Sequence, residues 1–280
     1  MSNITVTHRD EIYRFKSFVF PGGEVGIKFD KSERGPRDYL TFTLKAKSAH
    51  DLIELAMVKD AAERQFSQKQ SCLKLPYIPY ARQDRVCDEG EAFSLKVFCD
   101  YLNFLGFDNV EVVDPHSDVA PALINNVIVV KQEDIVAQFP ELISAITHGA
   151  VLVSPDAGAS KKTQAIARRL QRTEYIRADK LRNLSTGEVL ETIVYKDDFK
   201  GQDVVVCDDI ADGARTFIEL AKICKAKNCG KFSLYVTHGI FSKGIVPILD
   251  SGIDHVFTTD SFRSIFPEHP RLTVLRLNHT

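Results

Sequence analysis

The sequence lacks the features that mark membrane and secreted proteins. No apolar run reaches the length of about 18 residues that a membrane-spanning helix needs. The first residues, Met-Ser-Asn-Ile-Thr-Val-Thr-His-Arg-Asp, contain no apolar core of the kind that signal peptides carry. Tryptophan is absent, and so are low-complexity segments and long charged runs. These absences predict a cytoplasmic protein that does not interact with membranes.

The six cysteines form neither a metal-binding nor a disulfide pattern. No two of them stand as Cys-x-x-Cys, and none clusters with histidine. Several lie inside apolar runs, where cysteine acts as a small buried hydrophobic side chain. We therefore expect reduced thiols and no structural zinc site. The positions are Cys72, Cys87, Cys99, Cys207, Cys224 and Cys229.

Neither sign of charge dominates the chain. Lysine and arginine number 36 and aspartate and glutamate 38, so the formal net charge is −2. Proteins that bind nucleic acids generally carry an excess of basic residues, and we expect no nucleic-acid partner here. The chain has 280 residues, 44% of them hydrophobic. This length allows two domains of about 100 to 150 residues each.

Strand-like and helix-like segments alternate along the chain. Apolar residues recur with a helical period over 48–66, 92–105, 161–170 and 217–226. Short apolar runs typical of strands cover 73–79, 110–113, 151–154, 204–207 and 232–236. The alternation predicts an α/β fold with two similar halves, 1–132 and 133–280, each a mainly parallel sheet flanked by helices. Ligands bind to such sheets beyond the carboxyl ends of the strands.

The most informative segment is Val-Val-Val-Cys-Asp-Asp-Ile-Ala-Asp-Gly-Ala-Arg-Thr, over 204–216. The strand-like residues lead into two adjacent carboxylates, Asp208 and Asp209, and a loop of small residues precedes a predicted helix from Phe217. Backbone N–H groups at a helix N-terminus attract phosphate, and small residues let it approach the backbone. Carboxylates suit sugar hydroxyls or a magnesium ion. The segment therefore predicts a phosphorylated sugar as ligand.

A charged loop follows the strand expected over 73–79. It contains Arg82, Gln83 and Asp84. The planar guanidinium group and the amide suit phosphate oxygens or a nucleobase. Taken alone, such a segment is more often an ordinary solvated loop.

Carboxylates also stand at two further strand ends. Asp114 and His116 follow the strand over 110–113, and Asp156 follows the strand over 151–154. These groups suit a divalent cation or the oxygens of a triphosphate. A lone histidine is, by itself, more often a structural hydrogen-bonding residue.

Two cations, Lys180 and Arg182, lie in the segment Ala-Asp-Lys-Leu-Arg-Asn, which is followed by Leu-Ser-Thr-Gly. We expect this segment to be an exposed loop. Cations on a mobile loop can close over a reaction centre and neutralise developing charge. Seen alone, they are equally well two ordinary surface cations.

Taken in order, these segments resemble the ribose-phosphate pyrophosphokinases, the phosphoribosyl pyrophosphate synthetase family. The resemblance covers nearly the whole chain. Its strongest parts are Tyr-Ala-Arg-Gln-Asp-Arg over 80–85, Val-Ser-Pro-Asp-Ala-Gly over 153–158 and Val-Val-Cys-Asp-Asp-Ile-Ala-Asp over 205–212. The resemblance implies two phosphoribosyltransferase-like domains. It also implies transfer of the β,γ-diphosphate of ATP to the anomeric hydroxyl of ribose 5-phosphate, which yields phosphoribosyl pyrophosphate and AMP.

The resemblance implies that the N-terminal half binds ATP. Two of the implied residues fall on a hairpin that contacts the adenine side. In the family a neighbouring subunit lends this hairpin, so a homo-oligomer, either a dimer or a hexamer, is implied. The implied ATP-binding residues are Phe20, Glu24, Arg82, Gln83, Asp84 and His116.

The resemblance also implies the reaction centre. Lys180 and Arg182 match the catalytic cations of the family, and His116 is a third implied catalytic residue. The implied cofactor is Mg²⁺, held by His116, Asp156 and Asp114. Asp208 and Asp209 are implied to hold the ribose hydroxyls. The residues implied to cradle the 5′-phosphate are Asp212, Gly213, Ala214, Arg215 and Thr216.

Three features depart from the family pattern. Gly22 stands where the family carries an acidic or amide residue in the hairpin, and the sequence ends at Thr280 without the family's last helix. The second of these departures leaves open whether the oligomer is the family's usual hexamer and whether the allosteric phosphate site exists. The third departure is Arg215, which replaces a glycine of the phosphate loop.

Arg215 leaves the identity of the acceptor open. Its side chain either points into solvent or binds further phosphate oxygens of a larger acceptor. ADP-ribose is such an acceptor, used for NAD synthesis or salvage by phage-encoded relatives, which would act in the host cytoplasm. Two other classes stay open, namely a non-catalytic regulatory homologue and a phosphoribosyltransferase that shares only the Asp208-Asp209 loop.

Overall fold

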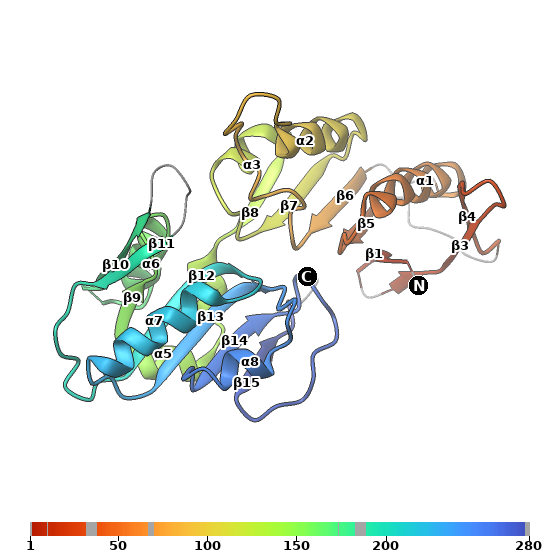
Figure 1. Cartoon of the computed structure of the whole chain (residues 1–280). Helices are drawn as coiled ribbons and strands as arrows, with labels where there is room; N and C mark the ends of the chain where they lie inside the picture. Colours follow the sequence, from red (N-terminus) through yellow and green to blue (C-terminus); the bar gives the residue numbers. More distant parts are fainter. Residues whose placement is uncertain are drawn as a thin grey trace. The chain divides into compact units, whose positions relative to one another are not determined.

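The computed structural model describes residues 2–9, 11–31, 38–66, 70–172, 174–182 and 189–277, with 180–182 and 189–190 described by their backbone alone. The chain forms two compact units, Met1–Val130 and Lys131–Asn278, and each has its own sheet and hydrophobic core (Figure 1). The predicted α/β fold with two mainly parallel sheets is confirmed.

The first unit is built on a six-stranded sheet in the order β2-β1-β5-β6-β7-β8. Strands β5 to β8 run parallel, whereas β1 is antiparallel to β5 and β2 is antiparallel to β1. A separate hairpin pairs β3 with β4 (Figure 1). The strands are β1 Ile4–His8, β2 Glu11–Tyr13, β3 Phe15–Val19, β4 Val25–Phe29, β5 Tyr39–Leu44, β6 Gln70–Leu75, β7 Asn109–Val113 and β8 Val127–Val130, and the helices are α1 Ala49–Gln65, α2 Ser94–Phe104 and α3 Val119–Leu123.

Helix α1 begins after Ser48, as its sequence predicts. The Asp51 carboxylate accepts backbone N–H bonds from Lys47 and Ser48 at 2.7 and 2.8 Å, as the acidic member of a capping box does. These hydrogen bonds lower the pKa of Asp51, although burial acts in the opposite direction. Leu55 and Val58 are fully buried where α1 packs against β4 and β5.

The second unit carries a seven-stranded sheet in the order β11-β10-β9-β12-β13-β14-β15. Its strands run parallel except β11, which is antiparallel to β10. The strands are β9 Val151–Ser154, β10 Ile176–Arg182, β11 Val189–Val194, β12 Val204–Ala211, β13 Phe232–Gly239, β14 His255–Thr259 and β15 Leu272–Leu275, and the helices are α4 Gln132–Val136, α5 Pro140–Thr147, α6 Ser160–Arg169, α7 Arg215–Ala226 and α8 Val246–Leu249.

Helices cover both faces of the second sheet around β12. Val204 and Val206 pack in one core with Leu220 of α7. Because side chains alternate along a strand, Asp209 points to the opposite face of β12. Helices α5 and α6 also contact β12. On the neighbouring strand, the ring of Tyr235 packs edge-on against Phe139, which precedes α5.

The strands at the centre of this sheet are longer than their apolar runs suggested. β12 continues to Ala211, so Asp208 and Asp209 are strand residues and not the start of a loop. Backbone pairing with β13 carries on from Asp208↔Val236 to Ala211↔Gly239. Ladder hydrogen bonds use backbone groups, and polar side chains therefore do not end the strand.

Two further boundaries correct the sequence expectations. Helix α7 begins at Arg215, two residues before the expected start at Phe217. Lys180 and Arg182 lie in strand β10 and not in an exposed loop. The backbone of β10 pairs with that of β11. The local sequence pattern did not predict β11, which comes after a polar segment.

Candidate active site

The loop between β12 and α7 presents unpaired backbone donors. Within the described residues, the N–H groups of Gly213, Ala214 and Thr216 donate no hydrogen bond. They stand at the N-terminus of a 12-residue helix, where the helix dipole favours an anion. The carbonyl oxygen of Ala211 accepts bonds from Ile240 and Phe241 at 2.9 and 3.1 Å, which ties the base of the loop to the segment after β13. This arrangement, called the cradle below, is typical of anion-binding sites.

The small residues of this loop have different roles in its geometry. Ala214 has a left-handed backbone with φ of 54°, a conformation that is strained for any residue except glycine. Gly213 has no such φ, and a Cβ built on it would meet no atom within 4 Å. The space beside Gly213 is therefore open for a ligand, and the strain falls on Ala214.

Arg215 points away from the cradle. Its guanidinium donates to the carboxylate of Glu219 at 2.8 Å, one helical turn further along α7. The Arg215 side chain is 87% exposed. The solvent-facing orientation, one of the two alternatives left by the sequence, is the one observed.

Asp208 and Asp209 are held differently at the end of β12. Asp209 is 5% exposed, and its Oδ2 lies 3.2 Å from Nζ of Lys162 on α6. The backbone N–H of Asp209 donates to Oδ1 of Asp208 at 2.9 Å. Burial, and next the charge of Asp209, raise the pKa of Asp208 well above its ordinary value. Among the described residues, only Asp209 of this pair has a cation, Lys162, beside it. A ligand that donates hydrogen bonds would therefore stabilise the second carboxylate, Asp208.

Asp156 follows β9 in the same unit. Its Oδ1 accepts the backbone N–H of Ala159 at 3.1 Å, and its carbonyl oxygen accepts the hydroxyl of Ser154 at 2.8 Å. These bonds define the turn into α6, so part of the role of Asp156 is structural. Its negative charge also contributes to the raised pKa of Asp208, which shows that the two carboxyl groups lie within electrostatic reach.

Strand β10 places the backbone of Lys180 opposite Thr192 of β11, and that of Arg182 opposite Val189. The register shifts between Leu181 and Arg182. Such irregularities are common beside active sites. The segment that follows, 183–188, lies outside the described residues.

In the first unit the charged loop after β6 is exposed. The side chains of Arg82 and Gln83 face solvent, and Asp84 is half-buried beside Arg85 with 3.6 Å between Oδ1 and Nε. A hydrogen bond inside the loop stabilises its backbone: the N–H of Gln83 donates to the carbonyl oxygen of Tyr80 at 2.8 Å. Its polar side chains are thus presented on a defined backbone.

Asp114 and His116 follow β7, as expected. Asp114 is 1% exposed and its backbone N–H donates to the carbonyl of Val130 at 2.8 Å, whereas His116 is exposed. Asp114 and His116 belong to the first unit and Asp156 to the second. Among the described residues no group of three or more histidine, cysteine, aspartate or glutamate side chains could by itself hold a metal ion. The oxygen donors present fit Mg²⁺, which usually takes one or two carboxylates and completes its shell with phosphates and water.

The hairpin residues Phe20 and Glu24 lie in the turn between β3 and β4. Phe20 is 52% exposed and its ring packs edge-on against Phe18. The carboxylate of Glu24 lies over Gly22, because a Cβ built there would come within 2.6 Å of Oε2. The hairpin therefore presents an aromatic ring and a carboxylate together at its tip.

Part of the backbone strain lies beyond the carboxyl ends of four strands. Of the nine described residues other than glycine that have positive φ, four follow β6, β7, β12 and β13. Such strain clusters at functional sites because the surrounding structure must over-determine it. The residues are Tyr80 at 61°, Asp114 at 39°, Ala214 at 54° and Phe241 at 44°.

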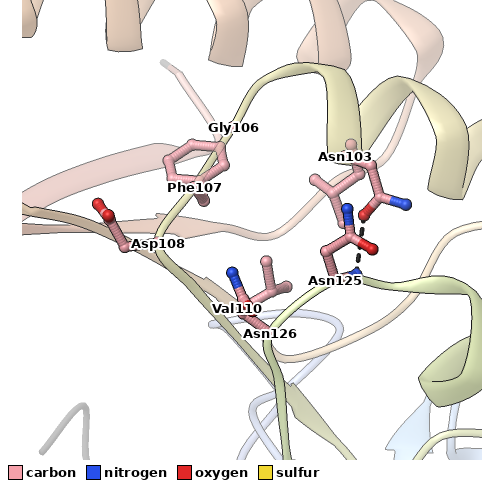
Figure 2. Close-up of a pocket in the computed structure, with 8 residues that line it drawn as sticks. Asn103, Gly106, Phe107, Asp108, Val110, Asn125 and Asn126 are labelled. Carbon is pink, nitrogen blue, oxygen red and sulfur yellow. Dashed lines mark hydrogen bonds between the residues drawn. The ribbon is translucent and has the colours of Figure 1, made fainter.

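A pocket of about 270 Å³ opens at the amino-terminal ends of the strands of the first sheet (Figure 2). It lies between the end of α2 and the residues that precede β7 and β8, including Asn103, Asp108 and Asn125. This is the amino-terminal edge of the strands, so the pocket is separate from the strand ends described above.

No helix among the described residues is both long and apolar enough to cross a membrane.

Lys162 is the site residue that the sequence did not reveal. It lies 47 positions before Asp209, in a helix with other exposed cations, and nothing in its local pattern distinguishes it. The parallel order of β9 and β12 offered one signal, since the helix after β9 must pass near the end of β12.

Comparison with known proteins identifies two family models. Residues 3–106 match the N-terminal domain of ribose phosphate pyrophosphokinase, and residues 131–254 match the phosphoribosyl transferase domain. The match over 3–106 also separates this chain from phosphoribosyltransferases that have a single domain of the second kind.

Similar proteins come from distant organisms. The ribose-phosphate pyrophosphokinase of Aquifex aeolicus is 30% identical over 249 residues, which are 87% of this chain and 77% of that protein. The ribose-phosphate pyrophosphokinase of Pyrococcus furiosus is 29% identical and covers 86% of this chain and 84% of its own length. The crystal structure of phosphoribosylpyrophosphate synthetase from Mycobacterium smegmatis superposes with a TM-score of 0.77 at 25% identity, covering 95% of this chain and 87% of that chain. With its two phosphoribosyltransferase-type domains, the chain belongs to the ribose-phosphate pyrophosphokinase family.

Proposed function

We propose that this protein transfers the β,γ-diphosphate of ATP to the anomeric hydroxyl of ribose 5-phosphate, giving phosphoribosyl pyrophosphate and AMP. The observation that carries this function is the cradle between β12 and α7. Among the described residues, three backbone N–H groups of this loop donate no hydrogen bond, a Cβ on Gly213 would meet open space, and the loop directly follows the strand that carries Asp208 and Asp209. A sugar that bears a terminal phosphate has the two chemical groups that this arrangement binds.

The acceptor binds to the second unit in this proposal. Asp212 to Thr216 hold the 5′-phosphate, and Asp208 and Asp209 accept hydrogen bonds from ribose hydroxyls. The backbone donors act at short range and need no side-chain movement, which favours a defined position for the anomeric hydroxyl. In-line transfer depends on that positioning more than on covalent chemistry.

ATP binds to the first unit, residues 1–132 in the sequence-based division. Arg82, Gln83 and Asp84 contact the nucleotide from the exposed loop after β6, and Phe20 and Glu24 contact the adenine side from the hairpin. Support for these roles comes from the family match over 3–106 and from the exposure of Phe20, Glu24, Arg82 and Gln83.

Mg²⁺ is the proposed cofactor, with Asp114, His116 and Asp156 as the residues that hold it. When bound, it neutralises phosphate charge and orients the triphosphate. The protein's own contribution is a hard oxygen donor on each unit and a histidine within reach of ATP in the first unit. Lys180 and Arg182 are the proposed catalytic cations, and they stabilise the negative charge that develops during transfer.

A homo-oligomer that acts in the cytoplasm completes the proposal. The exposed tip of the β3–β4 hairpin, with Phe20 and Glu24, supports a contact with a neighbouring subunit. ADP-ribose, the alternative acceptor, finds no support, because the similar proteins are named for ribose phosphate and Arg215 pairs with Glu219 away from the cradle.

The deciding experiment measures AMP release from ATP with Mg²⁺ in the absence of any nucleobase. We expect AMP and phosphoribosyl pyrophosphate to form with ribose 5-phosphate, and little AMP with ADP-ribose at the same concentration. A higher kcat/KM with ADP-ribose than with ribose 5-phosphate would show that ADP-ribose is the acceptor. Inactivity with both sugars would exclude the enzymatic function and favour a regulatory homologue.

A further inference from the structure

An ion pair links two elements that are distant in sequence at the acceptor site. Nζ of Lys162, in the first turn of α6, lies 3.2 Å from Oδ2 of Asp209. The side chains are 25% and 7% exposed, so the pair lies mostly out of water. The Coulomb attraction between two such charges is stronger than on the surface, but desolvation offsets much of it, so the main effect of removing one partner is to leave the other charge buried without its counter-ion.

The two carboxylates of β12 need this cation. Asp208 and Asp209 are adjacent, and the charge of one raises the pKa of the other. An incoming sugar phosphate would add further negative charge to the same site. A cation beside Asp209 offsets this repulsion and fixes which of the carboxylate oxygens face the sugar.

We propose that Lys162 is a positioning residue for the acceptor, which orients the Asp209 carboxylate for the ribose hydroxyls through their direct ion pair. This inference rests on the proposed function of the β12–α7 cradle. It assigns to α6, a helix that contributes no residue to the predicted site, a specific task in substrate binding.

The geometry distinguishes this role from mere stabilisation of the fold. Helix α6 is already anchored by Thr163 and Ile166, which are fully buried, and by the turn that Asp156 forms with Ala159. The helix therefore does not depend on Lys162 to pack against the sheet. The contact of its ammonium group with Asp209 lies instead at the strand end that meets the ligand.

The test compares five variants for binding of ribose 5-phosphate by calorimetry and for KM and kcat in AMP release. Lys162→Met removes the charge at nearly constant volume, and Lys162→Arg retains it. Arg168→Met is the matched control, because Arg168 is an exposed cation of the same helix. Asp209→Asn, alone and combined with Lys162→Met, shows whether Lys162 acts through Asp209.

We expect Lys162→Met to weaken ribose 5-phosphate binding about tenfold or more, as loss of one charge-assisted contact does, and to leave the KM for ATP within about twofold. Lys162→Arg should restore most of the affinity, and Arg168→Met should match the wild type. Adding Lys162→Met to Asp209→Asn should cost little further affinity.

Two results would overturn the inference. One is unchanged acceptor binding in a folded Lys162→Met variant, with folding checked by its Tm. The other is a full additive loss in the double variant, which would mean that Lys162 acts independently of Asp209. Failure of the proposed function would appear differently, as absence of AMP release in the wild type itself.

Discussion

Two neighbouring residues of the loop between β12 and α7 each supply one property that a single glycine often supplies alone. These properties are a left-handed backbone and open space for a ligand. Ala214 adopts the left-handed backbone, whereas Gly213 adjoins the open space. Strain at Ala214 stabilises nothing in the folded chain by itself. Under the proposed function, this conformation serves to direct the first N–H groups of the following helix at the 5′-phosphate. The two positions can therefore be separated by mutation.

We predict that Ala214→Gly stabilises the protein by up to about 1 kcal/mol, because glycine adopts φ of 54° without strain. Gly213→Ala should leave the free energy of unfolding within about 0.5 kcal/mol of the wild type. It should nevertheless raise the KM for ribose 5-phosphate about tenfold, since its methyl group fills the space beside the donors. Urea denaturation and steady-state kinetics measure the two effects. A destabilising Ala214→Gly, or a kinetically silent Gly213→Ala, would contradict this division.

Asp208 carries a cost in stability that depends on pH. Burial and the charge of Asp209 raise its folded-state pKa above 3.8, so ionising it costs free energy in the folded protein. The stabilisation due to the neutral form is complete below about pH 4 and is lost as the pH rises through the folded-state pKa. At pH 7 the wild type therefore bears a penalty that is absent at low pH.

Asp208→Asn should therefore raise Tm at pH 7 and change it little near pH 4, while weakening acceptor binding. The control is Asp51→Asn at the start of α1. The pKa of Asp51 is lowered, so its stabilisation is present above its ordinary pKa and is lost as the pH falls. That variant should lower Tm at pH 7 and have little effect in acid. Equal shifts at both pH values would show that neither carboxyl group acts through its charge.

At the scale of elements, the strand ends assemble the site. Strands β9, β12 and β13 are parallel neighbours, so the residues that follow them meet at one edge of the sheet. Strand β10 extends the same sheet with Lys180 and Arg182 on its backbone. A strand holds a cation at a more defined position than the exposed loop that the sequence suggested.

Lys180→Ala should lower kcat by at least about a hundredfold while leaving the Kd for ATP nearly unchanged, as loss of a contact made mainly in the transition state does. Lys196→Ala is a suitable control, because that lysine lies just beyond β11 in the same unit. Kinetics and equilibrium ATP binding measure the two quantities separately. A kcat close to that of the wild type would remove Lys180 from the mechanism.

At the scale of the whole molecule, the described residues form two hydrophobic cores that share no residue. Each core stabilises its own sheet, and a chain of this kind generally departs from two-state unfolding. The proposed acceptor site lies wholly within the second unit. Ligand binding there should stabilise that unit by mass action.

We therefore predict two calorimetric transitions, of which ribose 5-phosphate raises one. Leu220→Ala should destabilise the same transition by about 2 to 5 kcal/mol, since Leu220 is fully buried in the second core. Leu73→Ala, at an equally buried position of the first core, should lower the other. A single transition that shifts with every variant and with the ligand would show that the two units unfold together.

Local pattern was sufficient for much of the fold. Apolar runs and helical periods predicted the α/β alternation, and carboxylates after short apolar runs indicated the strand ends that carry the site. Both depend on properties that neighbouring residues share, namely backbone conformation and the period of burial. The family resemblance added roles for Lys180, Arg182 and the ATP-binding residues, and these stay predictions.

The sequence by itself thus determined the type and order of the elements, and with them the edge of each sheet at which we propose that ligands bind. Tertiary structure alone decided two things: the ion pair of Lys162 with Asp209 and the raised pKa of Asp208. Each depends on which helix packs beside which strand end and on how much water is left there. Such contacts join residues far apart in the chain, and no local period encodes them.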